Sequence, residues 1–502
     1  MKQMNCDILV IGGGGSGLVA GARAATMGKK VIVLEKDKSL GGGLNMASTL
    51  RTFGSKWQKE RGLDDHCAEY MRNRMDECFW RIDHKYAAAL IQGTGKFFDW
   101  FCETAPKEIV DQFYVGKYVF DGDDGPVGPQ AGGHFPGAGK GSGRLFVEVS
   151  ADKLRELGND IFTETTTKEL IKKDGKVCGA IAVIDGEETE ISASAVILAC
   201  GAWIRNEEFV KKYYPDLAAA QPYMGESPHM NRNYTADGLM LATKAGAKLD
   251  EKNLTIRMMG PMTMCRSRVM GDMSNSAYSI YVNKLGRRFV CEGSQLRMGV
   301  FNSGSVQVDQ PEGLCYVIFD EKALRATIEN PDIHPKPAVP MPFGASSFPA
   351  TMEEAMADIT PALEANDGVL FKADTLDELA EKLGIDAAGL KETIAQYNEA
   401  AKTGMDWDCY KPSEWLQSMD EAPYYGLKAS LGTDGAFGGL IVNENMQVQA
   451  EDGSILPGLY AVGDIASGRF VNMAGIKVQI LNDMANAVSS GYLAGTHAAE
   501  NI

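Results

Sequence analysis

The fold is decided by residues 7–37, which read DILVIGGGGSGLVAGARAATMGKKVIVLEKD. An apolar run over 6–11 precedes four consecutive glycines, and an alanine-rich run from Ser16 to Met27 follows them. A second apolar run, rich in β-branched residues, spans Val31 to Leu34. Because a glycine inside a regular element costs roughly 0.5–1 kcal/mol relative to alanine, four together indicate a place where side chains would obstruct something. This order predicts a buried parallel strand, a tight turn, a helix and a second strand.

The glycines also have a diagnostic spacing, since Gly12, Gly14 and Gly17 fit G-x-G-x-x-G. In this motif the first glycine allows a tight turn, the second lets backbone approach a diphosphate, and the third lets helix and strand pack closely. The helix N-terminus supplies free N–H groups to the phosphates. Glu35, about twenty residues further on, is placed to accept a hydrogen bond from a ribose hydroxyl. The motif therefore predicts dinucleotide binding.

Bulk composition excludes several classes of partner. The 502 residues carry a formal net charge of −17, which argues against nucleic acids and anionic membrane surfaces. The ten cysteines contain no C-x-x-C pair, so we expect no metal site and a reducing environment. The start, MKQMNCDILV, has no targeting pattern, and no apolar run approaches the roughly 18 residues of a membrane span. We expect a cytoplasmic protein with no membrane span.

Nine segments, in their order along the chain, resemble the flavoprotein family of fumarate reductase and succinate dehydrogenase. This family also holds urocanate-reductase-like and 3-ketosteroid-dehydrogenase-like enzymes. The resemblance covers nearly the whole chain. It is carried by VIGGGGSGLVAGARAA, VIVLEK, GGGLNMA, GKVCGAIAV, AVILACGAW, NYTADGLMLATKAGAKL, YVNKLGRRFVCE, IAQYNEAAKTGMD and GSILPGLYAVGD.

The resemblance implies an α/β fold with a Rossmann-like FAD-binding domain that is split in sequence. We expect this domain to comprise residues 1–222 and 421–502, with an inserted α+β capping domain over 223–420. The family implies an FAD-dependent oxidoreductase that acts on CH–CH groups. Nothing in the sequence resembles a haem, iron–sulfur or FMN-attachment module, so the electron donor or acceptor is expected to be external to the chain.

Cofactor roles carry over by position. The diphosphate would lie against the first glycine cluster, the ribose against Glu35, and the flavin side against the second cluster. We expect a helix from about Lys477 to Ala499, whose first N–H groups would face the flavin N1–C2 edge. Lys168 would meet adenine through its backbone. The residues expected to bind FAD are Gly12, Gly14, Gly15, Ser16, Gly17, Glu35, Lys36, Gly42, Gly43, Asn45, Lys168, Cys200, Gly201, Asp237, Gly463, Asp464, Val478 and Gln479.

The second glycine cluster lacks the histidine through which some family members hold FAD covalently, because it reads Gly43, Leu44, Asn45, Met46. The resemblance therefore implies non-covalent FAD.

The substrate site departs from the dicarboxylate enzymes of the family. The family's His-Pro-Thr segment is replaced by MMGPMTMC, with Gly260 before Pro261, and three further polar or cationic positions are also lost. We therefore expect a small-molecule substrate other than fumarate. Arg297 follows Glu292 by five residues, one more than the family spacing, and is the expected proton donor, with Tyr278 as the alternative. The residues expected near substrate are His134, His229, Tyr281 and Asp434.

The expected reaction adds or removes two hydrogens across a carbon–carbon bond next to an electron-withdrawing group. An α,β-unsaturated acid or enone would be the substrate of such an ene-reductase. Two alternatives remain open: a dehydrogenase of the 3-ketosteroid type, and a flavin-carrying electron-transfer subunit.

Overall fold

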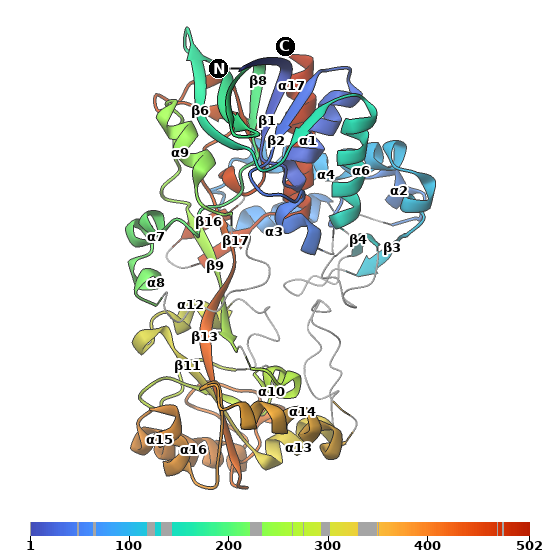
Figure 1. Cartoon of the computed structure of the whole chain (residues 1–502). Helices are drawn as coiled ribbons and strands as arrows, with labels where there is room; N and C mark the ends of the chain where they lie inside the picture. The colour runs from blue at the N-terminus through green and yellow to red at the C-terminus, as the bar shows by residue number, and fades with distance from the viewer. Residues whose placement is uncertain are drawn as a thin grey trace.

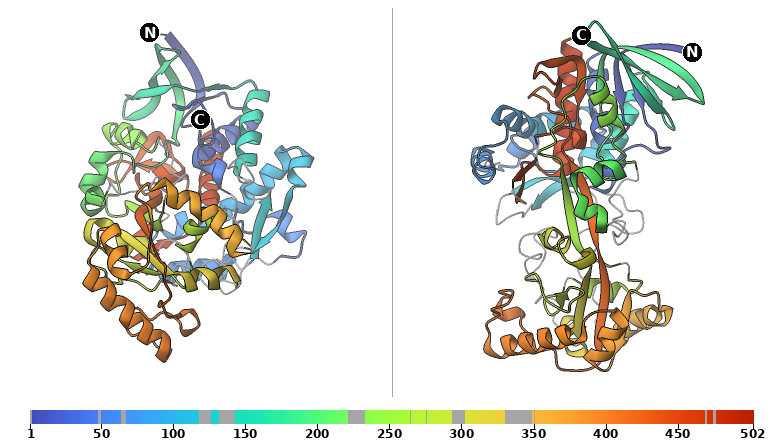
Figure 2. Two further views of the ribbon diagram at one scale, coloured as in Figure 1. Left: turned by 60° about the horizontal axis from the view of Figure 1, so that its bottom comes forward. Right: turned by 90° about the vertical axis from the view of Figure 1, so that its left-hand side faces the viewer.

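The computed structural model describes residues 2–47, 50–63, 67–117, 126–131, 143–220, 233–263, 265–274, 276–292, 302–329, 349, 351–468, 470–473 and 476–502. These residues form two lobes (Figure 1). The terminal lobe contains both ends of the chain and an eight-stranded sheet, and the inserted lobe contains a five-stranded sheet. Figure 2 shows that long strands connect the two lobes.

The terminal lobe is organised by parallel strands. Their order is β15 (Ile455–Ala461), β8 (Glu187–Leu198), β1 (Lys2–Ile11), β2 (Val31–Leu34) and β5 (Asp160–Phe162). Ile11 pairs with Leu34 on one side and with Leu198 on the other, so these strands end level with one another. The carboxyl ends of β1, β2 and β8 therefore meet at one edge, where open α/β sheets bind ligands.

Three antiparallel strands extend this sheet: β14 (Gln447–Gln449), β7 (Lys176–Ile184) and β6 (Thr166–Lys173). The turn between β6 and β7 lies at Asp174 and Gly175, both with positive φ. β8 is shared, because its first half pairs with β7 and its last residues pair with β15.

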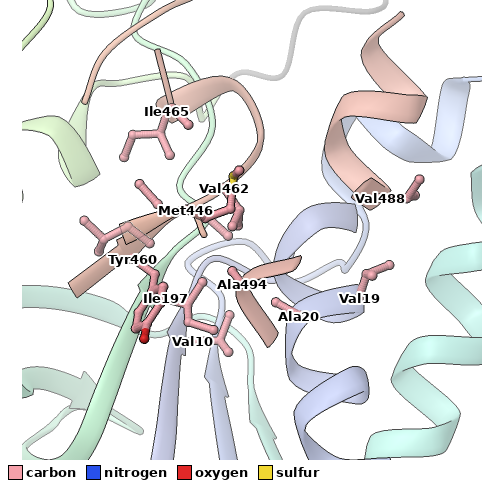
Figure 3. Packing of buried hydrophobic residues seen from close by; sticks show 14 of the residues in the cluster. Val10, Val19, Ala20, Ile197, Met446, Tyr460, Val462, Ile465, Val488 and Ala494 are labelled. Atoms are coloured by element: carbon pink, nitrogen blue, oxygen red, sulfur yellow. The ribbon is translucent and has the colours of Figure 1, made fainter. Parts of the chain in front are cut away.

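Helix α1 (Gly15–Thr26) packs between α6 (Gly143–Glu156) and α17 (Asp483–Glu500), and α17 also packs on α4 (His84–Thr104). Figure 3 shows Val19 and Ala20 of α1 and Val488 and Ala494 of α17 in one buried cluster. The helices approach closely because α17 carries glycine at the contact: a Cβ on Gly495 would lie 2.3 Å from the Ala20 carbonyl oxygen.

The remaining elements of the terminal lobe cover its sheet and the edge where the strands end. They are η1 (Gly42–Met46), α2 (Lys56–Lys59), α3 (Cys67–Glu77), α5 (Lys107–Val110), β3 (Phe113–Lys117), β4 (Pro126–Ala131), α7 (Glu207–Tyr213), α8 (Pro215–Ala220), α9 (Asp237–Lys244), η6 (Gly463–Ile465), β16 (Phe470–Met473) and β17 (Ile476–Gln479).

The inserted lobe is an antiparallel sheet with helices around it. Its strands are β9 (Thr255–Met262), β10 (Ile280–Val282), β11 (Cys315–Asp320), β12 (Leu370–Ala373) and β13 (Tyr424–Phe437). Its helices are α10 (Arg268–Met273), α12 (Asn302–Gln307), η3 (Pro311–Gly313), α13 (Glu321–Glu329), α14 (Met352–Ala365), α15 (Leu376–Leu383), α16 (Ala387–Thr403) and η5 (Ser413–Trp415). No helix in the described ranges combines the length and apolarity needed to cross a bilayer.

Strand β13 belongs to both lobes (Figure 1). Its first half pairs with β11 and β12, and its second half pairs with β9. The hydrophobic cores divide within it, because Ala429 packs in the inserted lobe and Leu431 packs in the terminal lobe. The domain limits at residues 222 and 421 remain predictions.

The predicted start of the last helix is wrong. Residues 476–479 form β17, which pairs with β16 as a hairpin, and the helix begins at Asp483. The helix starts there because the side chain of Asn482 accepts a hydrogen bond from the Ala485 N–H at 3.2 Å. Residues 375–401 contain two helices, α15 and α16, separated at Gly384, which has φ +71°.

Candidate functional site

The first glycine cluster forms a tight turn between β1 and α1. Gly12 has φ +112°, and a Cβ there would lie 2.3 Å from the Ala199 carbonyl oxygen. A Cβ on Gly17 would lie 2.0 Å from the Gly12 carbonyl oxygen. The protein's own backbone therefore demands glycine at both positions. Gly14 differs, since the nearest atom to its hypothetical Cβ is 4.0 Å away.

The space in front of Gly14 faces the start of α1. Gly14 is the N-cap residue and offers no side chain to cap the helix, so no side-chain cap occupies the first N–H groups. These groups carry the positive end of the helix dipole and suit a phosphate. The turn thus provides an open, electropositive cradle lined by backbone.

The second glycine cluster lies against the first. The Gly41 N–H donates to the Gly13 carbonyl oxygen at 2.8 Å. A Cβ on Gly15 would strike the Leu44 side chain at 2.1 Å. The Asn45 amide is used internally, donating to the Leu40 carbonyl oxygen at 2.8 Å.

Glu35 stands at the carboxyl end of β2, as predicted. Its carboxylate accepts hydrogen bonds at 2.7 Å from the backbone N–H groups of Gly13 and Asp37. Burial raises the pKa of Glu35, against the opposing effect of these two bonds. The Thr165 N–H donates to the Glu35 carbonyl oxygen at 2.8 Å. The carboxylate is therefore fixed beside the glycine turn, where a ribose would reach it.

Two segments distant in sequence complete this edge. Cys200 follows β8, and its thiol donates to the Ile11 carbonyl oxygen at 3.2 Å. Burial raises the pKa of the Cys200 thiol to about 12, so it stays protonated at neutral pH. From the C-terminal part of the chain, Gly463 has φ +73°, and a Cβ there would lie 2.7 Å from the Ser16 hydroxyl oxygen.

Lys36 ties the end of β2 to α9. Its ammonium donates to the Thr235 hydroxyl and to the Asp237 carboxylate, both at 2.6 Å. The structure thus brings Lys36 and Asp237 into direct contact. No local sequence pattern predicts this contact. The same is true of the bond from the Gly463 N–H to the Ser490 hydroxyl at 3.0 Å.

Some predicted cofactor residues are not brought to this cradle by their side chains. The Lys168 ammonium pairs with Glu188 at 2.5 Å, and both side chains are about half exposed. Val478 and Gln479 lie on β17, whose backbone is described. The roles assigned to these three residues remain predictions.

Two of the predicted catalytic and substrate residues, Tyr278 and Tyr281, are buried in the core of the inserted lobe. The Tyr281 hydroxyl donates to the Ser274 carbonyl oxygen at 2.5 Å. Asp434 is described only as backbone of β13.

Three further predicted residues, Arg297, His134 and His229, lie outside the described residues. All of these roles remain predictions.

A buried ion network lies in the segment that leads to Arg297. The Arg288 guanidinium donates two bonds of 2.8 Å to Glu292 and one of 2.9 Å to Asp406. The Lys411 ammonium lies 3.7 Å from Glu292. Burial opposes ionisation of Glu292, but Lys411 and Arg288 prevail and hold its pKa below the ordinary value. Glu292 is thus a structural anion without access to solvent.

Asp272, on α10, has the opposite character. Burial raises its pKa to about 6, and Arg268, 3.9 Å away, lowers it only in part. A carboxyl with this pKa exchanges protons readily near neutral pH. This pKa depends on packing, which no local sequence pattern reveals.

The level strand ends, the open cradle at Gly14 and the carboxylate of Glu35 define a dinucleotide-binding flavoprotein, and these residues fit FAD. The family model described as FAD binding domain matches residues 7–476, and the chain belongs to that family. The predicted fold and cofactor are confirmed.

Relatives extend this assignment. The chain is 27% identical to NADH:acrylate oxidoreductase of Vibrio harveyi over 92% of its own length, but it spans 47% of that protein. It is 25% identical to vinyl phenol reductase of Lactiplantibacillus plantarum, with 99% of the chain and 97% of the relative covered. A flavocytochrome c3 fumarate reductase in its open conformation shares the fold, with TM-score 0.70, 22% identity, and coverage of 99% of this chain and 78% of that one. The predicted class of FAD-dependent oxidoreductase agrees with each of them.

Proposed function

We propose that the protein is an FAD-dependent reductase of carbon–carbon double bonds that are activated by an electron-withdrawing group. The observation that carries the proposal is the similarity to vinyl phenol reductase, which extends over 99% of this chain and 97% of that enzyme. Acrylate and vinyl phenol both contain a carbon–carbon double bond conjugated to a further π system, the carboxyl group in the first and the aromatic ring in the second. The lost His-Pro-Thr segment, with Gly260 in place of the histidine, supports a substrate less charged than fumarate.

FAD, when bound, supplies a hydride to one carbon of the double bond. The protein's own part is to hold the cofactor and to deliver a proton to the other carbon. Arg297 is the proposed donor, with Tyr278 as the alternative. An arginine relays a proton only with a carboxylate nearby, because its own pKa lies far above neutrality. Glu292 is buried and held ionised by Lys411 and Arg288, so a different carboxylate would have to supply this proton.

We propose that FAD is bound non-covalently. The second glycine cluster holds no histidine, and the Asn45 side-chain amide donates to the Leu40 carbonyl oxygen within the same loop. The electrons would come from an external donor, since the chain resembles no haem, iron–sulfur or FMN module.

The test is anaerobic photometry of the purified, FAD-loaded protein with reduced methyl viologen. A panel of aromatic enoates, vinyl phenols, acrylate, fumarate and a 3-ketosteroid is supplied in turn. Oxidation of the viologen by an enoate or vinyl phenol, with little activity on fumarate, is the expected result. Dye reduction by the steroid would favour the dehydrogenase instead. No turnover with any compound, together with a stable complex with a redox protein, would favour an electron-transfer subunit.

The proton donor is tested by Arg297→Ala. We expect the variant to bind FAD normally and to lose at least about 100-fold in turnover, the usual scale for a general acid. Unchanged turnover would remove Arg297 from the mechanism, and Tyr278→Phe would then be the variant to compare.

A further inference from the structure

Tyr234 lies between two loops that flank the cofactor cradle. A Cβ on Gly201 would lie 2.8 Å from its Cε1 atom and 3.1 Å from its Cδ1 atom. A Cβ on Gly43 would lie 2.9 Å from its hydroxyl oxygen. The ring edge therefore rests on one loop and the hydroxyl reaches the other, and each loop has a glycine where the tyrosine touches it.

These two loops stand on either side of the first glycine turn. Gly43 belongs to η1, which follows Gly41, the residue bonded to Gly13. Gly201 follows β8. The Ala199 carbonyl oxygen, at the end of the same strand, leaves no room for a Cβ on Gly12. The Tyr234 side chain thus connects the two sides of the cradle.

The backbone around Tyr234 is fastened on one side to the end of β2. The Asn233 amide donates to the Asp37 carboxylate at 2.7 Å. Lys36 donates to Thr235 and Asp237, both at 2.6 Å. The segment from Asn233 to Asp237 is therefore anchored directly beyond Glu35.

The other side of the segment is fastened to the chain after β8. The Arg205 N–H donates to the Tyr234 carbonyl oxygen at 2.8 Å, and the Asn206 amide donates to the Thr235 carbonyl oxygen at 3.1 Å. Anchors on both sides hold the backbone of Tyr234 at a fixed place over the cradle.

We propose that Tyr234 is a clasp that retains FAD by covering its adenosine-diphosphate half. The ring spans the loops that border the diphosphate cradle, on the side of Glu35, where the family resemblance would place the adenosine. An aromatic side chain suits this role, because it covers a large area with only two rotatable bonds and carries a hydroxyl at its far end. FAD enters and leaves when the ring swings aside on its anchored backbone.

The experiment measures FAD retention without any substrate, so its failure is distinct from failure of the proposed reaction. Holoenzyme is diluted, and FAD release is followed by the rise in flavin fluorescence. The dissociation constant is measured on the apoprotein, with ADP as a competitor for the adenosine-diphosphate half. For Tyr234→Ala we expect the dissociation constants for FAD and ADP both to rise at least about tenfold, the usual scale for a well-packed aromatic contact.

Two further variants keep the test decisive. Tyr234→Phe keeps the ring and should stay within about threefold of the parent, while Tyr234→Leu, which removes the ring and keeps apolar bulk, should behave like alanine. The matched control is Tyr213→Ala, because Tyr213 lies at the end of α7, where its hydroxyl donates to the exposed Glu251 at 2.6 Å. Thermal unfolding of each apoprotein checks that the fold is intact.

The proposal is overturned if Tyr234→Leu or Tyr234→Ala, folded, binds FAD within about threefold of the parent. It is also overturned if FAD binding weakens while ADP binding does not, since the ring would then cover the other half of the cofactor. A loss in Tyr234→Phe as large as in Tyr234→Ala would assign the effect to the hydroxyl and would overturn the clasp.

Discussion

Replacing Gly14 with alanine should weaken FAD binding without destabilising the folded protein. Gly14 has φ −69° and ψ 174°, an extended conformation that alanine adopts freely. The added methyl would meet nothing closer than the Ala199 carbonyl oxygen at 4.0 Å. Within the protein itself, the substitution therefore creates neither strain nor a clash.

The magnitude follows from these contacts. Removing a glycine from the unfolded chain stabilises a protein by about 0.4–1 kcal/mol when the native conformation tolerates the side chain. Gly14 is also the N-cap of α1, where alanine is less favourable than glycine by a similar amount, so the Gly14→Ala apoprotein should be about as stable as the parent. The methyl occupies the space where a diphosphate approaches the backbone. Overpacking of this kind costs about 1–3 kcal/mol, which corresponds to a loss of roughly 5-fold to 150-fold in FAD affinity.

Two measurements test this reasoning, with Gly12→Ala as the matched control. Urea unfolding of the apoproteins should place Gly14→Ala close to the parent and Gly12→Ala well below it, because Gly12 has φ +112° and a Cβ there would lie 2.3 Å from the Ala199 carbonyl oxygen. Fluorescence titration should show weakened FAD binding by Gly14→Ala. If this variant binds FAD as the parent does, the diphosphate does not lie against Gly14 and the assigned cradle is wrong.

Three further predictions concern pH, the ion network and the cofactor linkage. Burial raises the pKa of Asp272 from 3.8 to about 6, so its ionisation opposes folding as the pH rises through this interval. Asp272→Asn should therefore add about 1–3 kcal/mol to the free energy of unfolding at pH 8 and nothing at pH 3.5. An equal effect at both pH values would refute the raised pKa. Glu292→Gln leaves the buried Arg288 and Lys411 poorly compensated and should cost about 3–5 kcal/mol, seen as an earlier urea transition of the inserted lobe; an unchanged transition would contradict the network's role. Acid precipitation should release all flavin into the supernatant, whereas yellow colour in the pellet would reveal a covalent link.

The cradle could be predicted from sequence because its geometry is local. Gly12, Gly14, Gly17 and Glu35 occupy one strand–turn–helix–strand unit, and the strand from Val31 to Leu34 is found with the predicted ends. The spacing of these residues along the chain fixes their arrangement in space, so no long-range contact is needed to infer it.

What the sequence could not provide depends on contacts between distant segments. Tyr234 meets Gly43 and Gly201 only after three loops come together. The pKa of Asp272 results from burial among neighbours that no local pattern identifies. The error at Lys477 has a similar origin, because the hairpin of β16 and β17 keeps that segment in a strand until Asn482 starts the helix.

The strand shared by the two cores limits how the lobes can move. β13 runs without interruption from one core into the other, and β9 accompanies it through the crossing, from Ser430 paired with Met262 to Phe437 paired with Thr255. Two irregularities in this pairing, between Ser430 and Gly432 and between Thr433 and Gly435, fall at the crossing. A two-stranded ribbon twists more easily than it stretches or shears. A rotation of one lobe relative to the other should therefore be a torsional motion about this ribbon, with its pivot at the irregular pairs.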